Sequence, residues 1–434
     1  MISHKISVKN FVYPLFFIEW IYLYFAEISP FTGVLLGISW FGFTLWQVVL
    51  SYRQNLLWLL VMWLFMMMYS FEPVRYFLYG DTLSFRVQCE SDYTAYQVAL
   101  ICYLFALCLG YFTKLRRLST KEISTTQIIY SPLYVWIICI AFGVYCMVFG
   151  QSGDTILESG GYGQGSKNVS SLYGYGIIPI VVALRYSYSH SRKVIVVLLA
   201  LCYILKTLLY GGRIDAIMLI IAFYTLYFYK VFNKRTSVIL LFCAFLFNQA
   251  WEVIRQSINH INVKESLVDT ASNLSISSGN SADVYYASER IIYLIKNGIL
   301  GVQERFLSFM YFMESSVVSY SSLPALANLS SFNMSRYGTG GGGLVPVFIY
   351  AWLGIPGVIL VSSLLGMGLS RFIRGKCGTF MYFYIVFVIA TIPRWYAYYP
   401  IQLIKFCVYG AIFAIVMDIL RKGRIPVIGL KKRR

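Results

Sequence analysis

LVPVFIYAWLGIPGVILVSSLLGMGLS, residues 344–370, contains no charged side chain and is apolar along almost its whole length. An α-helix rises about 1.5 Å per residue, so a helix of this length crosses the roughly 30 Å hydrocarbon core of a bilayer. Similar apolar runs recur along the chain and predict about 12 transmembrane helices. They lie near 11–28, 31–50, 55–72, 95–113, 128–149, 172–189, 194–210, 214–232, 236–251, 344–370, 378–392 and 400–420.

The composition agrees with a lipid environment. Of 434 residues, 59% are hydrophobic and 12% are charged, whereas soluble domains carry roughly 25% charged residues. The net charge of +18 does not indicate nucleic-acid binding, because most basic residues lie in short gaps between apolar runs. The fold class that follows is an all-α polytopic membrane protein, with the lipid bilayer as partner and no nucleic acid.

The basic residues also predict the orientation of the chain. Lys and Arg are concentrated in alternate gaps, for example at 114–121, 230–235 and 371–376, and in the tail at 421–434. Positively charged loops stay on the cytoplasmic side of a membrane protein. We therefore expect both the N- and C-termini to be cytoplasmic and the number of helices to be even.

This orientation predicts four regions: an N-terminal bundle of about nine helices at 1–251, a large external segment at 252–343, C-terminal transmembrane helices at 344–420, and a basic cytoplasmic tail at 421–434. In the external segment, 264–283 has the composition of an exposed loop, and 284–322 has the helical periodicity of helices that lie at the membrane interface or cap the bundle. No cytoplasmic gap is long enough to fold a nucleotide-binding domain.

External arginines are the first candidate site residues, because the guanidinium fork pairs with phosphate and carboxylate oxygens. Arg213, Arg255, Arg336 and Arg394 lie at predicted helix ends or in tight turns, which favours anion binding. The alternative is that external arginines anchor loops at lipid headgroups, and this is the favoured interpretation for the remainder: Arg75, Arg86, Arg290 and Arg305.

A glycine-rich run reinforces one of these arginines. Arg336, Tyr337 and Gly341 belong to SRYGTGGGG, residues 335–343, which leads directly into the helix predicted at 344–370. Glycine permits backbone conformations that other residues resist, and the amides at a helix N-terminus attract anions. The run is a candidate cradle for a diphosphate, although flexible loops also contain glycine runs. It is not a P-loop, because no GK[ST] follows.

Aromatic residues surround another arginine in PRWYAYYP, residues 393–400. Trp395, Tyr396 and Tyr399 accompany Arg394 at the external end of a predicted helical hairpin. Aromatic rings stack on sugar faces and tyrosine hydroxyls add hydrogen bonds. A belt of aromatic residues at the membrane interface is an equally good interpretation.

Candidate general bases are few. Glu252 and His260 lie at the start of the external segment, and either is able to accept a proton. Glu252 is three residues before Arg255, so a local salt bridge on one helix face is the main alternative. Glu19 lies inside the first predicted helix, where an acid is costly and is expected to pair with an arginine or line a cavity. No CxxC or HExxH spacing occurs, so no metal site is expected.

The glycine-rich run before LVPVFIYAWLG, the PRWYAYYP motif, the GGR turn at 211–213 and the large external segment together resemble Wzy-type O-antigen or capsule repeat-unit polymerases. The resemblance covers the predicted topology, and its motifs lie mainly in the last part of the chain. It implies a GT-C-like membrane glycosyltransferase in the bacterial inner membrane, with 252–343 in the periplasm. Its substrate would be an undecaprenyl-diphosphate-linked oligosaccharide, and neither a cofactor, a metal nor a nucleotide sugar would be needed. Arginines would hold the diphosphate, and a histidine is the base in the related ligases. A chain-length regulator protein is left open as a further partner.

Two other functions stay open. A lipid-linked oligosaccharide flippase has a similar number of helices, but it is expected to show two similar halves and short external loops. The sequence has no internal repeat and a long external segment, which favours a polymerase. An O-antigen ligase would use the same donor and transfer it to a lipid A core, and the sequence does not separate it from a polymerase.

Overall fold

A computed structural model describes residues 8–79, 92–113, 131–153, 155, 167–169, 171–210, 212–228, 233–257, 280–318, 322–337, 342–395 and 400–423. Across these residues the chain is helical, apart from one pair of three-residue strands. Four of the helices described are long and apolar enough to cross a membrane: Pro30–Tyr52, Asp92–Phe112, Val345–Ile373 and Pro400–Lys422. The chain therefore has the helical make-up of a membrane protein.

The prediction of about 12 crossings is met only in part. Six more apolar helices coincide with predicted segments but are shorter than a full crossing: Phe11–Phe25, Leu56–Phe65, Leu133–Phe149, Leu172–Arg185, Ile214–Tyr227 and Thr379–Ala390. The segments predicted at 194–210 and 236–251 coincide with α11 (His190–Leu209) and α14 (Lys234–Ser257). Neither is among the four long apolar helices, and α11 contains Arg192, Lys193 and Lys206.

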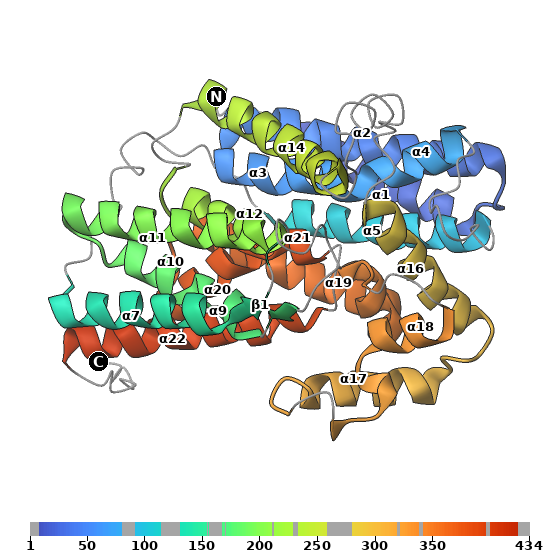
Figure 1. Cartoon of the computed structure of the whole chain (residues 1–434). Helices are drawn as coiled ribbons and strands as arrows, with labels where there is room; N and C mark the ends of the chain where they lie inside the picture. Colours follow the sequence, from blue (N-terminus) through green and yellow to red (C-terminus); the bar gives the residue numbers. More distant parts are fainter. Residues whose placement is uncertain are drawn as a thin grey trace, which may run out of the picture. The chain divides into compact units, whose positions relative to one another are not determined.

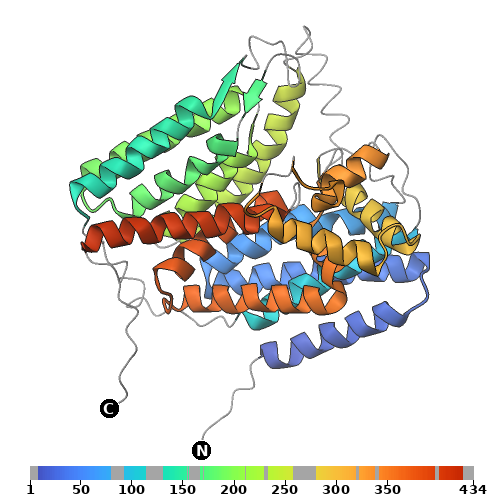
Figure 2. The ribbon, with the colours of Figure 1, turned by 90° about the horizontal axis from the view of Figure 1, so that it is seen from below.

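The helices pack into two compact units (Figures 1 and 2), which join segments from distant parts of the chain. The first unit comprises Met1–Arg117, Thr270–Gly375 and Ile392–Gln402, and the second comprises Leu118–Asp269, Lys376–Thr391 and Leu403–Arg434. Packing thus groups the chain across the region boundaries that we expected from the sequence.

The first unit contains helices from both halves of the sequence. They are α1 (Val8–Phe25), α2 (Pro30–Gln54), α3 (Leu56–Phe65), the π-helical turn η1 (Met66–Ser70), α4 (Phe71–Tyr79), α5 (Asp92–Phe112), α16 (Asn280–Lys296), α17 (Val302–Glu314), the 3₁₀ turn η4 (Ala325–Ala327), α18 (Leu329–Tyr337), α19 (Val345–Ile373) and α21 (Ile392–Trp395). The 3₁₀ turn η5 (Pro400–Leu403) follows where the chain passes into the second unit.

Helix α5 is the centre of the first unit. It is buried along nearly its whole length and packs against α1, α2, α16 and α19. Side-chain hydrogen bonds fix its position: Trp20 Nε1 donates to the Leu100 carbonyl (2.9 Å), Tyr96 donates to the Leu23 carbonyl (2.7 Å), and Thr113 donates to the Gly366 carbonyl (3.4 Å). In an apolar environment such bonds to backbone carbonyls add specificity to close helix packing.

The third predicted segment continues beyond its expected end. We expected a loop from residue 73, but α3, η1 and α4 form one nearly continuous helix up to Tyr79. The extension packs closely against α2 at Gly33 and Gly37, since a Cβ at Gly37 would lie 3.1 Å from the Val74 Cα. This Gly-x-x-x-Gly spacing allows two helix backbones to approach closely.

The external segment contains two different kinds of helix. Helix α16 is buried from Val284 to Ile292 and packs on α5 and α19, so it belongs to the bundle of the first unit. Helix α17 instead exposes large apolar side chains, as expected for an interfacial helix. The loop predicted at 264–283 lies outside the described residues except for the first turn of α16.

The second unit contains α7 (Leu133–Phe149), α9 (Ser171–Tyr175), α10 (Ile177–Arg185), α11, α12 (Ile214–Phe223), the π-helical turn η2 (Tyr224–Phe228), α14, α20 (Thr379–Ala390) and α22 (Lys405–Lys422). It also holds an antiparallel pair of strands, β1 (Gln151–Gly153) and β2 (Lys167–Val169), in which Ser152 pairs with Asn168. Figure 2 shows this pair beyond the end of α7. The all-α prediction did not include it.

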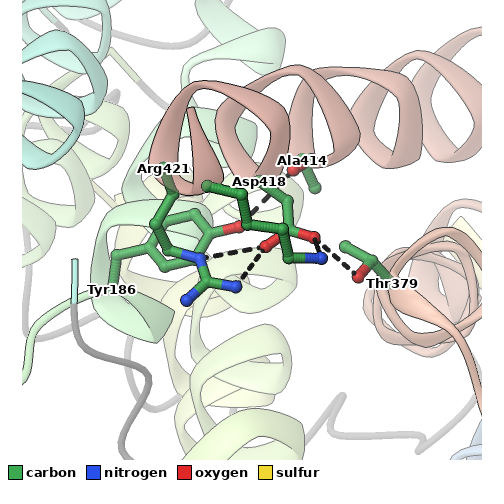
Figure 3. A network of polar contacts seen from close by, with 6 residues as sticks. Tyr186, Thr379, Ala414, Asp418 and Arg421 are labelled. Carbon is green, nitrogen blue, oxygen red and sulfur yellow. Dashed lines mark hydrogen bonds and ion pairs between the residues drawn. The ribbon is translucent and has the colours of Figure 1, made fainter. Parts of the chain in front are cut away.

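A polar network joins three helix ends of the second unit (Figure 3). Asp418 on α22 accepts a hydrogen bond from Arg421 (2.8 Å) and pairs with Lys422 (2.7 Å), and Thr379 on α20 lies 3.3 Å from the same carboxylate. Tyr186, which follows α10, donates to the Ala414 carbonyl (3.5 Å). These groups satisfy one another within the protein, so we assign the network a role in packing.

Candidate functional site

Most of the predicted site residues lie beyond what the structure describes. His260, Gly341, Tyr396 and Tyr399 are outside the described residues, and of Glu252, Arg255 and Tyr337 only the helical backbone is described. Glu252 and Arg255 belong to the last turns of α14, in the second unit, and their spacing of three places them on one helix face. Their roles stay predictions.

Arg213 occupies the position just before α12, in the second unit. Its side chain is half-buried, and the preceding Gly212 donates its N–H to the Thr207 carbonyl (2.9 Å), which tightens the turn after α11. Lys206, the residue immediately before Thr207, donates to the carbonyls of Met147 (2.6 Å) and Gln151 (3.1 Å). Sequence analysis did not single out Lys206, which caps the C-terminal carbonyls of α7 as a cation is expected to do.

Arg336 is the predicted anion-binding residue whose position the structure describes most fully. It is exposed in the last turn of α18, and its guanidinium carbon lies 4.6 Å from the centroid of the Phe332 ring. The ring supports the long side chain by a cation–π contact. The arginine is thus held at the surface directly before the glycine-rich run.

The described end of the glycine-rich run is a packed turn. Gly342 and Gly343 have φ values of 87° and 146°, and a Cβ at Gly343 would lie 2.8 Å from the Phe348 ring. Gly342 donates its N–H to the Ser330 hydroxyl (2.5 Å), and Leu344 donates its N–H to the Ser288 hydroxyl (2.8 Å). These two amides are used inside the protein, whereas Gly341 lies outside the described residues and its role in a cradle stays a prediction.

The aromatic motif has one member in the protein core. Trp395 is only 3% exposed, and its ring meets Phe65 and Phe105 edge-on at 6.2 and 6.3 Å. A ring buried to this extent is not accessible for stacking on a sugar, so the structure favours a packing role for Trp395. Arg394 is half-buried in the short helix α21.

Two arginines that we expected at lipid headgroups have other surroundings. Arg290 on α16 is 7% exposed, and its guanidinium carbon lies 4.9 Å from the Tyr286 ring centroid. Arg305 on α17 donates to the carbonyls of Tyr350 (2.9 Å) and Ala351. The headgroup interpretation therefore does not describe these two residues.

The carbonyls that Arg305 binds lie at a break in α19. Gly354 has φ 64° and ψ −163° there, and Pro356 has no N–H to donate to the preceding turn. A broken helix leaves carbonyl oxygens without their usual partners. Arg305 supplies hydrogen bonds from another helix, and Ser308 and Phe312 of α17 hold Trp352 beside the break. The sequence signal was present in GIPG, residues 354–357, but its partner on α17 was not predictable from spacing.

A group of tyrosines and cations lies in the same part of the first unit as the break in α19. Lys296 Nζ is 4.2 Å from the centroid of the Tyr93 ring, and the guanidinium carbon of Arg305 is 5.9 Å from the centroid of the Tyr350 ring. Tyr24 and Tyr93 are near Tyr350. Tyr24 and Tyr93 are exposed, and Tyr350 is half-buried. These residues come from α1, α5, α16, α17 and α19, so only the packing of the unit brings them together. We call the set of Tyr24, Tyr93, Lys296, Arg305 and Tyr350 the tyrosine–lysine group.

The first unit also contains buried acids. Glu72 and Glu289 are 3% and 2% exposed, and Thr94 donates to Glu289 Oε2 (3.2 Å). Glu19, the acid expected to need an arginine or a cavity, accepts a hydrogen bond from the Ser39 hydroxyl. Among the described residues no group of three or more His, Cys, Asp or Glu side chains is arranged to hold a metal ion.

Comparison of the chain with protein-family models, with curated proteins and with solved structures gives no match.

Proposed function

We propose that this protein polymerises undecaprenyl-diphosphate-linked oligosaccharide repeat units into an O-antigen or capsular polysaccharide at the periplasmic face of the bacterial inner membrane. The observation that carries the proposal is the tyrosine–lysine group, together with Arg336, in a unit that contains three helices long enough to cross a membrane. Cations suit a diphosphate, and exposed tyrosines suit the sugars attached to it.

The course of the helices in the first unit supports the proposed topology. Three helix ends meet in this unit: the C-terminal ends of α1 and α4 and the N-terminal end of α5. Tyr96 on α5 donates a hydrogen bond to the Leu23 carbonyl on α1, and Tyr76 on α4 donates one to Asp92 on α5 (2.7 Å). The alternation proposed for about 12 transmembrane helices makes all three of these ends periplasmic. It also makes both termini cytoplasmic.

The proposed reaction is a glycosyl transfer without a nucleotide. A hydroxyl oxygen at the non-reducing end of a lipid-linked repeat attacks the anomeric carbon of the growing chain, and a new C–O glycosidic bond forms. The bond from that carbon to the diphosphate oxygen breaks, and undecaprenyl diphosphate leaves. The hydroxyl proton passes to a base, for which Glu252 and His260 stay candidates. Fixed cations near the leaving diphosphate would stabilise its developing charge.

Deletion of the gene in its bacterium, followed by gel analysis of the surface polysaccharide, tests the reaction class. A polymerase is expected to leave a single repeat unit on the lipid A core and no ladder, because export and ligation still operate. Lipid-linked units retained on the cytoplasmic side would instead identify a flippase. Full-length polymer retained on undecaprenyl diphosphate would identify a ligase.

Complementation of the deletion tests the site. Arg336→Ala and Lys296→Ala are expected to shorten or abolish the ladder at normal protein abundance, because each removes a cation near the proposed diphosphate. A matched control is Lys422→Ala, which removes a cation from the polar network of α22 in the second unit. An unchanged ladder with Arg336→Ala, Lys296→Ala and Arg394→Ala would overturn the site assignment while leaving the deletion result intact.

A further inference from the structure

Helix α17 has a docking face and an exposed face. Arg305, Ser308 and Phe312 form the face that docks on α19 around Trp352. The exposed face carries Gln303 and Glu314 along one edge, next to Met310. The rest of the exposed face is an apolar stripe at helical spacing, which we call the α17 stripe. Its members are Val302, Phe306, Met310 and Met313.

The α17 stripe is too apolar to be an ordinary water-facing surface. Val302 and Phe306 are 83% and 61% exposed, and no charged residue interrupts the four positions. Contiguous exposed apolar surface bordered by polar residues marks a site of contact with a partner or a membrane. At 13 residues, α17 is only about 20 Å long and is too short to cross a bilayer.

The pattern of buried and exposed side chains along α19 indicates where α17 lies relative to the lipid. Before the break, Val345 to Trp352 is covered by protein, apart from the half-buried Tyr350. From Leu353, directly before the break, apolar side chains are exposed along one side of the helix: Leu353, Ile359, Leu360, Leu364 and Met367. Lipid contact on α19 therefore begins at the break, where α17 docks.

The length of α19 beyond the break agrees with this level. Residues 355–373 rise about 28 Å at 1.5 Å per residue, which is close to the roughly 30 Å hydrocarbon thickness. The break, and α17 with it, would then lie at the boundary between the hydrocarbon and the headgroups. A short helix with one apolar face is suited to lie in the plane of this boundary.

We propose that α17 is an in-plane membrane helix whose stripe inserts among the acyl chains of the nearer leaflet, and that Arg305 ties it to the broken segment of α19. The occupant of the stripe is thus the lipid surface. This inference is independent of the proposed glycosyl transfer, because it rests on exposure, helix length and the contacts of Arg305 alone.

Photo-cross-linking in vesicles tests the proposal. The full chain carries benzoylphenylalanine in place of Phe306, or in place of Glu304, about 160° around the helix from Phe306, as the matched control. Each variant is reconstituted in vesicles of phosphatidylethanolamine and phosphatidylglycerol, irradiated, and digested for mass spectrometry. Replacement of the lipid-facing Leu360 calibrates the yield for a residue in the hydrocarbon.

The expected result is at least about fivefold more lipid adduct at Phe306 than at Glu304, since only the apolar face of an in-plane helix enters the acyl chains. Equal yields at the two positions would overturn the proposal. So would adducts at Phe306 that join two copies of the chain in place of lipid. If the Phe306 variant unfolds at a lower temperature than the parent, Met310 on the same stripe takes its place in the comparison.

Discussion

At the scale of single residues, the structure separates side chains that hold the fold from those that are available to a ligand. Trp395 and Arg290 were functional or headgroup candidates by type, yet both are buried among aromatic rings. Arg336 was a candidate by type and is exposed. Arginine alone does not distinguish these roles, because burial is decided by the helices that pack around it.

A matched pair of arginine variants tests this separation. Arg305→Ala removes charged hydrogen bonds to carbonyls at a helix break, so a loss of about 1.5–3 kcal/mol in unfolding free energy is expected. Arg336→Ala removes an exposed side chain and is expected to change the unfolding free energy by less than about 0.5 kcal/mol. Thermal unfolding of both purified variants in the same detergent measures the difference. Equal melting temperatures would contradict the role of Arg305 at the break.

Gly343 makes a second prediction at this scale. Gly343→Ala would place a Cβ 2.8 Å from the Phe348 ring at a φ of 146°, and a loss of about 1–3 kcal/mol is expected from overpacking and strain. Gly378→Ala is the control, because a Cβ at Gly378 meets nothing within 4 Å and φ is −70°. Thermal unfolding compares the two, and a neutral Gly343→Ala would argue against the buried turn.

At the scale of elements, close helix contacts depend on glycine. A Cβ at Gly366 on α19 would lie 2.7 Å from the Leu109 carbonyl oxygen on α5. This contact brings α5 and α19 together without an intervening side chain. The same principle joins α2 to α4 at Gly37.

Gly366→Leu is therefore expected to separate α5 from α19 and to cost about 2–4 kcal/mol, because backbone cannot move aside as a side chain does. The matched control is Gly42→Leu on α2, where a Cβ meets nothing within 4 Å. Limited proteolysis and thermal unfolding report the loosening. If Gly42→Leu is as harmful as Gly366→Leu, the effect comes from leucine and not from the contact.

At the scale of the whole molecule, the number of membrane crossings is the main open prediction. Four described helices are both long and apolar enough to cross, whereas six other apolar helices are shorter and α11 contains three basic residues. Shorter apolar helices are accommodated by local thinning of the bilayer or by packing against neighbours. The alternating positions of basic residues still favour about 12 crossings.

Reporter insertions decide between these counts. Alkaline phosphatase, which is active only outside the cytoplasm, is expected to be active after residues 85, 160 and 270. It is expected to be inactive after residues 120 and 232, where basic residues precede the insertion. Activity after both residue 160 and residue 232 would show that the three segments predicted at 172–189, 194–210 and 214–232 do not all cross the membrane. The order of the remaining helices would then have to be revised.

The sequence by itself determined the helical class, the approximate places of the apolar helices and the helical periodicity of 284–322. Apolar periodicity and charge act locally, so they are legible without a partner. Only the tertiary structure decided that α16 is buried, that α4 continues past residue 73, and that β1 pairs with β2. It alone brought Lys296 to Tyr93 and Arg305 to the break in α19. These contacts join residues 45 to about 200 positions apart, and such pairings depend on which helix faces meet, which no local pattern encodes.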